Sequence, residues 1–192
     1  LGYEFGTFTD RFEKLEEALQ IILPMLRGER PSLDGKHYQV VEAINSPAPL
    51  GRIPVMIGGG GERKTLRMVA QYADESNIIC APAEIGRKLD ALAGHCEKLG
   101  RDRAEITVSL QTSACVAPTH EQAVAEFEAY LARNPRAEVR RSSTIVGDPD
   151  EVAQRFADLK AAGVDGFTVN SPANGHIKGL VSLLGETLAP LI

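Results

Sequence analysis

Four short apolar stretches alternate with longer segments of helical periodicity, and this alternation restricts the fold more than any other feature of the chain. The apolar stretches predict strands at 53–57, 76–80, 106–116 and 164–170. The segments between and after them predict helices at 62–72, 83–99, 119–133, 148–162 and 176–188. Strands that alternate with helices in this way form a parallel sheet with helices packed outside it, so we predict an α/β fold.

Two architectures fit this alternation: an open, doubly wound sheet, or part of a (β/α)8 barrel. A complete barrel needs eight strands and typically about 250 residues. The chain has 192 residues and four predicted strands, which suits one domain but only half of such a barrel. The pattern of residues alone leaves both architectures open.

The region before the first of these strands has a different pattern. Regularly spaced apolar residues predict a helix over 10–26, which we expect Pro24 to bend or end early. The residues after this helix show no helical periodicity. Because Asp34-Gly35 is a strong turn signal, we predict a small excursion that contains a hairpin.

Composition and charge exclude several classes of protein. With 43% hydrophobic residues and a formal net charge of −5, the chain is too apolar and too weakly charged for general disorder. No apolar window approaches the roughly 20 residues that a membrane helix needs. An acidic chain without a basic stripe is not expected to bind nucleic acid. We therefore predict neither a membrane nor a nucleic-acid partner.

The three cysteines, Cys80, Cys96 and Cys115, are odd in number, widely spaced and without the spacing of metal ligands. They are typical of small apolar side chains in a reducing compartment, which predicts a cytoplasmic protein without a metal site. The chain begins at Leu1 rather than Met and shows no signal-peptide pattern. We therefore expect either a fragment or the loss of an upstream segment.

Four consecutive glycines, Gly58, Gly59, Gly60 and Gly61, join a predicted strand to a predicted helix. Such a run is entropically costly, and a tight turn with positive φ needs only one or two glycines. Without Cβ atoms, glycine N–H groups approach an anion closely, and the start of the next helix adds a favourable dipole. The cations Arg63 and Lys64 follow at once. This combination favours an anion-binding loop over a simple turn.

Two nucleotide-binding motifs almost fit the glycine run and then fail. A P-loop requires a glycine where this chain has Arg63, and no other predicted strand ends in an acid placed to hold Mg²⁺. A dinucleotide-binding G-x-G-x-x-G places its last glycine on Arg63 or Lys64, and the strand at 76–80 has no acid to hold a ribose. We therefore expect neither nucleoside triphosphate hydrolysis nor dinucleotide binding.

Longer stretches of the sequence resemble a known family. Residues 54–61, in which Pro-Val-Met-Ile leads into the four glycines, and residues 65–77 resemble a stretch typical of luciferase-like monooxygenases. They look closest to the branch that uses the deazaflavin coenzyme F-420. Four further segments agree in order and spacing: 11–19, 33–38, 147–153 and 162–167. The resemblance spans nearly the whole chain.

The resemblance implies a (β/α)8 TIM barrel of the luciferase-like type, of which this chain supplies the C-terminal half, strands five to eight with their helices. Residues 1–192 then form a single domain. Residues 1–52 hold the helix after strand four and the excursion loop, and 53–192 hold four βα units. In the family, most contacts to the flavin ring come from the first four strands, so no catalytic residue is assigned here.

The resemblance also implies a cofactor, coenzyme F-420 or alternatively FMN, at the carboxyl ends of the strands. The residues expected to bind it are Gly58, Gly59, Gly60, Gly61, Arg63 and Asn77. The implied reaction is hydride transfer between reduced coenzyme F-420 and a small organic substrate. Two alternatives stay open: an FMN-dependent monooxygenase of the same fold, and a non-catalytic phosphate- or flavin-binding half-barrel. Because the family commonly dimerises, a homodimer is expected.

Few other polar residues are candidates for a substrate contact, a cofactor contact or a nucleophile. His176 follows the last strand on the side where barrel sites form, and we expect it to contact substrate. Asn77 and Asn170 fall near strand ends, where a polar group either faces the cofactor or closes a turn. Ser113 and Cys115 have no base near them in the sequence, so neither is expected to be a nucleophile. The remaining histidines are expected at the surface: His37, His95 and His120.

Overall fold

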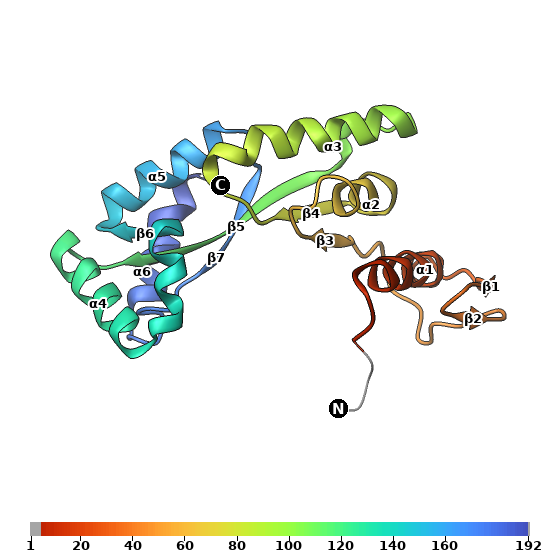
Figure 1. Ribbon diagram of the computed structural model, residues 1–192, viewed down its shortest axis with the longest axis horizontal. Coiled ribbons are helices and arrows are strands. Elements are labelled where there is room, and N and C mark those ends of the chain that lie inside the picture. Colours follow the sequence, from red (N-terminus) through yellow and green to blue (C-terminus); the bar gives the residue numbers. More distant parts are fainter. Residues whose placement is uncertain (1–4, 192) are drawn as a thin grey trace.

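The computed structural model describes residues 5–191, which form a parallel sheet with helices packed along it and a small hairpin beside the first helix (Figure 1). The helices are α1 (Phe8–Leu26), α2 (Thr65–Tyr72), α3 (Ile85–Leu99), α4 (His120–Arg133), α5 (Pro149–Ala161) and α6 (Leu180–Leu188). The strands are β1 (Leu33–Asp34), β2 (Gln39–Val40), β3 (Met56–Gly58), β4 (Glu75–Ile78), β5 (Thr107–Val116), β6 (Thr144–Gly147) and β7 (Gly166–Asn170). None of the described helices combines the length and the apolar character needed to cross a membrane.

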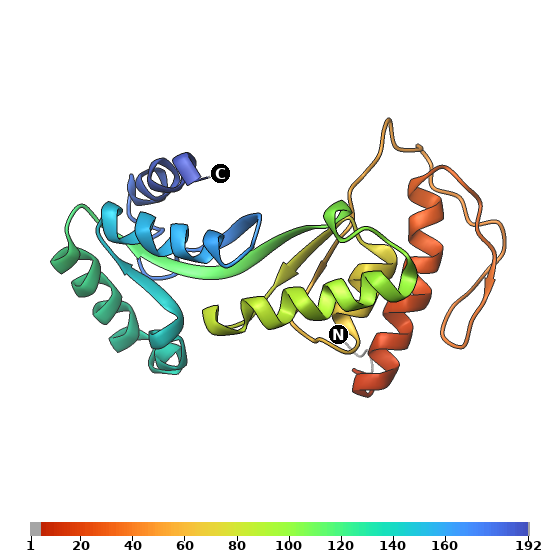
Figure 2. The same ribbon diagram turned by 90° about the horizontal axis from the view of Figure 1, so that it is seen from above.

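Strand β5 is the centre of the sheet and runs from the middle of the molecule into its left-hand part in Figure 2. Its first residues pair with β4, its middle with β7 and its last four residues with β6. Strand β4 pairs in turn with β3, so Ile57, Ser76 and Val108 lie side by side. Every pairing in this sheet is parallel, which confirms the prediction from the alternating pattern.

The sequence predicts four strands in this region, and the structure has five. Between the predicted helices at 119–133 and 148–162, where no strand is predicted, a 3₁₀ helix over Pro135–Ser143 leads into β6. Strand β6 pairs with residues 113–116, the part of β5 that continues beyond its pairing with β7. Because β6 has four residues and only Gly147 is fully buried, it lacks the alternation that identifies a strand in a sequence.

The predicted helices are all present, and the shifts at their starts have local causes. Helix α2 begins at Thr65, three residues later than predicted, because a turn over residues 62–64 precedes it. Helix α6 begins at Leu180 rather than at 176, after Gly179 with a φ of +91°. Both starts are therefore displaced by turns that side-chain periodicity does not reveal.

The N-terminal region agrees with the prediction except at Pro24. Helix α1 continues through Pro24 and ends at Leu26, so the proline does not end the helix early. The excursion contains the predicted hairpin: Leu33 of β1 lies opposite Val40 of β2 in an antiparallel pair, and the Gly35 N–H donates to the Tyr38 carbonyl at 2.9 Å.

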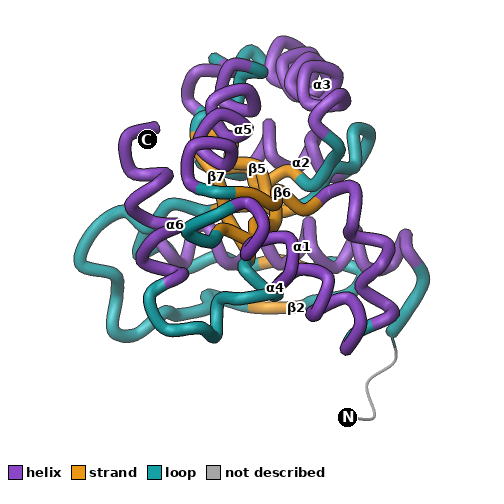
Figure 3. The backbone as a smooth tube through the Cα atoms, turned by 90° about the vertical axis from the view of Figure 1, so that its left-hand side faces the viewer, coloured by secondary structure: helices purple, strands orange, loops and turns teal. Residues whose placement is uncertain are grey.

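The hydrophobic core lies on the side of the sheet that carries α3 and α5, which are on the same side of the strands in Figure 3. Alternate strand residues such as Ile57 and Val108 point into this core and are buried. Phe156 of α5 meets Phe167 of β7 edge to face, with ring centroids 4.8 Å apart. The strand residues that alternate with these buried ones face the opposite side of the sheet, where Met56 is 47% exposed. Around β3 this second face is open, and we call it the open face; at the end of β5 the same side is covered by α4, where Cys115 packs against Phe127 and Leu131.

A charged pair between two helices fixes the position of α1. The Arg67 guanidinium on α2 donates to both carboxylate oxygens of Glu16 on α1, at 2.7 and 3.0 Å. The hydroxyl of Tyr72 donates to the same carboxylate at 3.3 Å. The bonds from Arg67 hold the pKa of Glu16 below its usual value. Helix α1 is therefore attached to the helix that follows the glycine run.

A second, exposed pair joins α4 to α5 and predicts a pH dependence. Nδ1 of His120 lies 2.8 Å from Oε2 of Glu151, and this bond raises the pKa of His120 above its usual 6.5. The pair therefore stabilises the folded protein fully below pH 6.5, and this contribution is lost as the pH rises through the higher folded-state pKa. We expect an NMR titration of the ring to give a midpoint above 6.5, and Glu151→Gln to lower it. An unchanged midpoint in that variant would contradict the assignment of the shift to Glu151.

Candidate functional site

All strands of the parallel sheet run in one direction, and the glycine run follows the carboxyl end of β3, beside the carboxyl end of β4. Gly58 is the last residue of β3 and lies opposite Asn77 of β4. In sheets built from βα units, ligands bind outside the carboxyl ends of the strands, in the loops that follow them. We therefore take the loop at these strand ends as the candidate site.

Contacts with the backbone of β4 and the residue after it determine the shape of the glycine run. The Gly59 N–H donates to the Asn77 carbonyl at 2.8 Å, and Gly59 has a φ of +127°, which favours glycine. A Cβ atom on Gly60 would lie 2.5 Å from the carbonyl oxygen of Ile79, and one on Gly61 would lie 2.9 Å from Oγ1 of Thr65. Three of the four glycines are therefore required by local space or conformation.

The same loop presents backbone donors that no described residue uses. Among residues 5–191, the N–H groups of Gly60, Gly61 and Arg63 make no hydrogen bond to a protein acceptor. Helix α2 begins after Lys64 without a side-chain cap. Free N–H groups in a glycine loop at a helix N-terminus form a site suited to an anion such as a phosphate. The fit of the loop to a phosphate rests on these donors.

The two cations after the loop differ in their availability. Arg63 is exposed, and its side chain makes no ion pair within the described part of the chain. The Lys64 ammonium lies over two aromatic rings of α1, 5.3 Å from the centroid of Phe8 and 5.2 Å from that of Phe12. Arg63 is therefore the cation of this pair that is free to meet a bound anion.

Helix α3 holds Glu62, the first residue after the glycines. The Glu62 carboxylate accepts from Lys88 at 2.7 Å and lies 3.2 Å from Arg87. The bond from Lys88 holds the pKa of Glu62 below its usual value. A ring nitrogen of His95 lies 2.7 Å from the Glu62 carbonyl oxygen. The prediction that His95 is simply a surface residue is wrong, because the ring is half-buried against the loop.

Asn77 lies next to the glycine run and has two structural contacts. Its side-chain nitrogen donates to Oγ of Ser109 at 2.8 Å and to Oγ1 of Thr168 at 2.9 Å, which joins β4, β5 and β7 on the open face. Its backbone carbonyl accepts the bond from Gly59. The Asn77 backbone closes the turn and its side chain bridges the strands, and the predicted contact of Asn77 with the cofactor stays a prediction.

The predicted residues beyond the last strand are exposed, and a buried neighbour organises them. Asn170 ends β7, and His176 lies on the exposed turn that follows. Asn174 in this turn is fully buried and donates to the Val116 carbonyl at 2.8 Å and to Glu126 at 2.6 Å. No local pattern in the sequence marks Asn174 as buried.

Two further groups of side chains show no catalytic arrangement. Burial raises the pKa of the Cys115 thiol to about 12, so this thiol stays protonated at neutral pH. Ligand atoms of Asp10, Glu13 and His37 lie within 4.8 Å of one another, but the Lys36 ammonium is 2.8 Å from the Glu13 carboxylate. That cluster therefore already contains its own cation. His37, expected in an exposed turn, has a side chain that is only 12% exposed.

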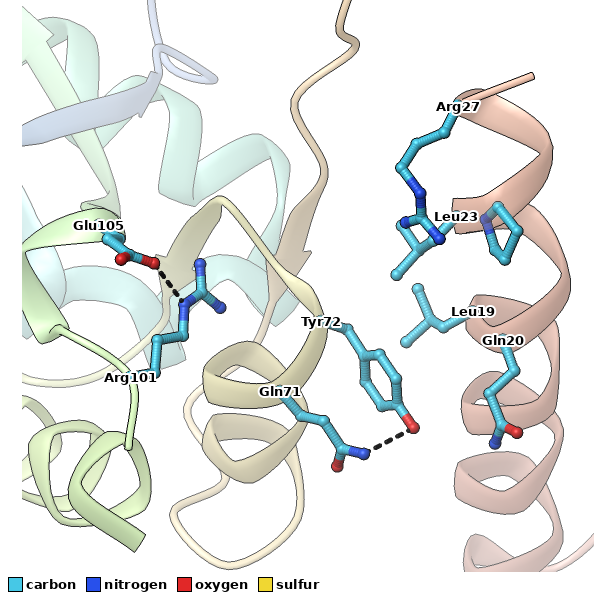
Figure 4. Close-up of a pocket in the computed structure, with 9 residues that line it drawn as sticks. Leu19, Gln20, Leu23, Arg27, Gln71, Tyr72, Arg101 and Glu105 are labelled. Carbon is cyan, nitrogen blue, oxygen red and sulfur yellow. Dashed lines mark hydrogen bonds and ion pairs between the residues drawn. The ribbon is translucent and has the colours of Figure 1, made fainter. Parts of the chain in front are cut away.

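A hollow of about 580 Å³ lies between α1 and α2, and Figure 4 shows the residues around it. Leu19 and Leu23 face it from α1, and Tyr72 faces it from the end of α2. Two arginines line it and both are already paired, Arg101 with Glu105 at 3.2 Å and Arg27 with Glu29 at 2.6 Å. The hollow borders the carboxyl ends of the helices, away from the glycine run, so we do not assign the functional site to it.

Comparisons with known proteins identify the family of the chain. A family model described as luciferase-like monooxygenase matches residues 2–141. An F420-dependent glucose-6-phosphate dehydrogenase of Rhodococcus jostii is 27% identical over 216 residues, covering 97% of this chain and 63% of that relative. One from Microbacterium testaceum is 29% identical, covering 93% of this chain and 53% of the relative. The chain therefore spans less than two thirds of the length of these relatives.

Solved structures share the fold at low sequence identity. An F420-dependent secondary alcohol dehydrogenase in complex with an F420-acetone adduct has a TM-score of 0.81 at 13% identity, covering 98% of this chain and 64% of that protein. A riboflavin lyase with modified FMN and riboflavin has a TM-score of 0.78 at 15% identity, covering 99% and 59%. The predicted fold class is confirmed: the chain has the α/β architecture of part of these larger proteins.

The space around Gly60 predicts a clear effect of substitution. Gly60→Ala places a Cβ atom against a backbone carbonyl that cannot move freely, so we expect the free energy of unfolding in urea to fall by roughly 1–3 kcal/mol. The matched control is Gly86→Ala, since nothing lies within 4 Å of a Cβ at that helical position. It should leave stability unchanged or raise it by up to about 1 kcal/mol. Equal stability of the two variants would contradict the tight contact at Gly60.

Proposed function

The chain belongs to the luciferase-like monooxygenase family, and from that premise we propose that it forms the phosphate-binding half of a flavin- or deazaflavin-dependent oxidoreductase. The observation that carries the proposal is the glycine run, whose N–H groups at Gly60, Gly61 and Arg63 have no acceptor among the described residues. These donors lie at the edge of a parallel sheet where ligands of βα folds bind. Both FMN and coenzyme F-420 carry a phosphate that such a loop can hold.

Coenzyme F-420 is the cofactor we propose first. The relatives that match almost the whole chain are named F420-dependent glucose-6-phosphate dehydrogenases, and a solved structure with the same fold is an F420-dependent alcohol dehydrogenase. FMN is the second candidate, because a riboflavin lyase with modified FMN shares the fold nearly as closely. The reaction we propose is hydride transfer between reduced coenzyme F-420 and a small organic substrate. If the cofactor is FMN, the alternative reaction is monooxygenation.

In this proposal the residues of the chain bind and orient. Gly58, Gly59, Gly60 and Gly61 bring backbone close to the phosphate, and Arg63 adds a charged donor beside it. Asn77 supports the loop through its carbonyl. The bound cofactor supplies the hydride chemistry, while the protein supplies position and electrostatics. His176, exposed on the turn after β7, is the residue of this half that we propose to contact substrate.

The proposal extends to the domain boundaries, the oligomeric state and the location of the protein. We propose that residues 1–192 form one domain, in which 1–52 hold the helix after strand four with its excursion, and 53–192 hold strands five to eight of the barrel together with the additional short strand β6. A homodimer is proposed, and exposed apolar side chains on the excursion, at Val41, Ile44 and Leu50, support it. A cytoplasmic location is supported by Cys80, Cys96 and Cys115, which are all free thiols.

The test is a fluorescence titration of the intact protein with coenzyme F-420, with FMN, and with the phosphate-free form of each. We expect one cofactor to bind at micromolar or lower concentration and more tightly than its phosphate-free form. Arg63→Gln should weaken the phosphorylated ligand roughly fivefold to tenfold by removing a charge-assisted hydrogen bond. Lys64→Gln is the matched control and should change this affinity little, because that ammonium lies over Phe8 and Phe12.

The same titration separates the proposal from its alternatives. A protein that binds neither cofactor at micromolar concentration overturns the proposal. A protein that binds one cofactor but catalyses no hydride transfer or oxygenation with it is a non-catalytic binding module. Tight binding with no preference for the phosphorylated form would mean that the glycine loop does not bind the phosphate.

A further inference from the structure

Helix α3 makes a contact with the glycine loop that the proposed function does not use. His95, in the middle of α3, lies with Nε2 2.7 Å from the carbonyl oxygen of Glu62. A carbonyl oxygen only accepts hydrogen bonds, so the ring nitrogen is the donor and carries the proton. The bond spans 33 residues of sequence, from the helix to the residue directly after the four glycines.

This bond sets the orientation of one peptide unit. The Glu62–Arg63 peptide is trans, and in a trans peptide the C=O of one residue and the N–H of the next point in opposite directions. Because His95 holds the Glu62 carbonyl toward α3, the Arg63 N–H is turned away from α3. That N–H is one of the donors without an acceptor among the described residues.

A second contact from α3 keeps the same residue in place. Lys88 lies about two turns before His95, on the same face of the helix, and its ammonium is 2.7 Å from the Glu62 carboxylate. The Lys88 side chain is only 12% exposed. Lys88 holds the side chain of Glu62, which can rotate about its own bonds, whereas His95 holds the backbone. Only the bond from His95 fixes the direction of the peptide.

We propose that His95 is a positioning residue of the phosphate loop: by holding the Glu62 carbonyl it presents the Arg63 N–H to the phosphate of the bound cofactor. The inference rests on the proposed function. His95 itself does not touch the ligand. The bond from His95 orders the Arg63 N–H before the ligand binds, which lowers the entropic cost of binding the phosphate. Removal of His95 therefore weakens phosphate binding without changing contacts to the rest of the cofactor.

The experiment compares the intact wild-type protein with His95→Phe and His95→Gln. The ligands are the cofactor that the wild type binds, coenzyme F-420 or FMN, and its phosphate-free form, with Kd measured by fluorescence. His95→Phe keeps a planar ring but has no donor, and we expect it to lower the preference for the phosphorylated ligand about fivefold. Affinity for the phosphate-free form should stay the same. His95→Gln restores an N–H donor and should recover most of the preference.

Two further variants guard against effects on folding. His95→Asn keeps a polar amide that is too short to reach Glu62, and it should lose the preference as His95→Phe does. His120→Gln is the matched control, because it removes a histidine that is bonded to Glu151 on distant helices. It should retain the wild-type preference. Thermal unfolding of each variant confirms that the proteins compared are folded.

The outcomes distinguish this inference from the proposed function. A wild type that shows no preference for the phosphorylated ligand overturns the proposed function and this inference with it. A wild-type preference that survives in His95→Phe and His95→Asn overturns the inference alone. Equal weakening of both ligands would mean that His95 is merely structural, and would also overturn it.

Discussion

Parallel pairing along β5 is the constraint on which the rest of the structure depends. Strand β5 has ten residues, and three strands pair with successive parts of it: β4 with its start, β7 with its middle and β6 with its end. Because all of them run in the same direction, their carboxyl ends and the loops after them point the same way. The glycine run after β3 lies beside the end of β4, and the turn after β7 follows the same direction further along the sheet.

The glycine run has two properties with a single origin. Its backbone packs so closely against β4 and the residue beyond it that the Asn77 carbonyl accepts from Gly59 and the Ile79 carbonyl occupies the space of a Cβ on Gly60. The same close packing leaves the next N–H groups without internal acceptors. A tight turn and an anion loop, which the sequence poses as alternatives, are therefore compatible with each other, and anion binding stays a prediction. The steric need for glycine produces the free donors.

Much of this fold could be predicted because it depends on local patterns. The helices, the hairpin at Asp34-Gly35 and the parallel class follow from periodicity and turn residues. The features that were missed depend on contacts distant in sequence. Strand β6 exists because β5 extends beyond β7, and His95 meets Glu62 across 33 residues. Asn174 is likewise buried by β5 and α4, which no pattern around it records.

The location of the loop also determines what its contacts can contribute to a reaction. A phosphate is a non-reacting part of a flavin or deazaflavin, so in the proposed function the free N–H groups and Arg63 would bind it equally well before and during hydride transfer. Such uniform binding lowers the Kd of the cofactor but does not by itself raise kcat. Its value for catalysis lies in orientation, since a rigidly held phosphate restricts where the ring can lie. Rigidity therefore matters more than the number of contacts, and a loop held by β4 on one side and α3 on the other provides it.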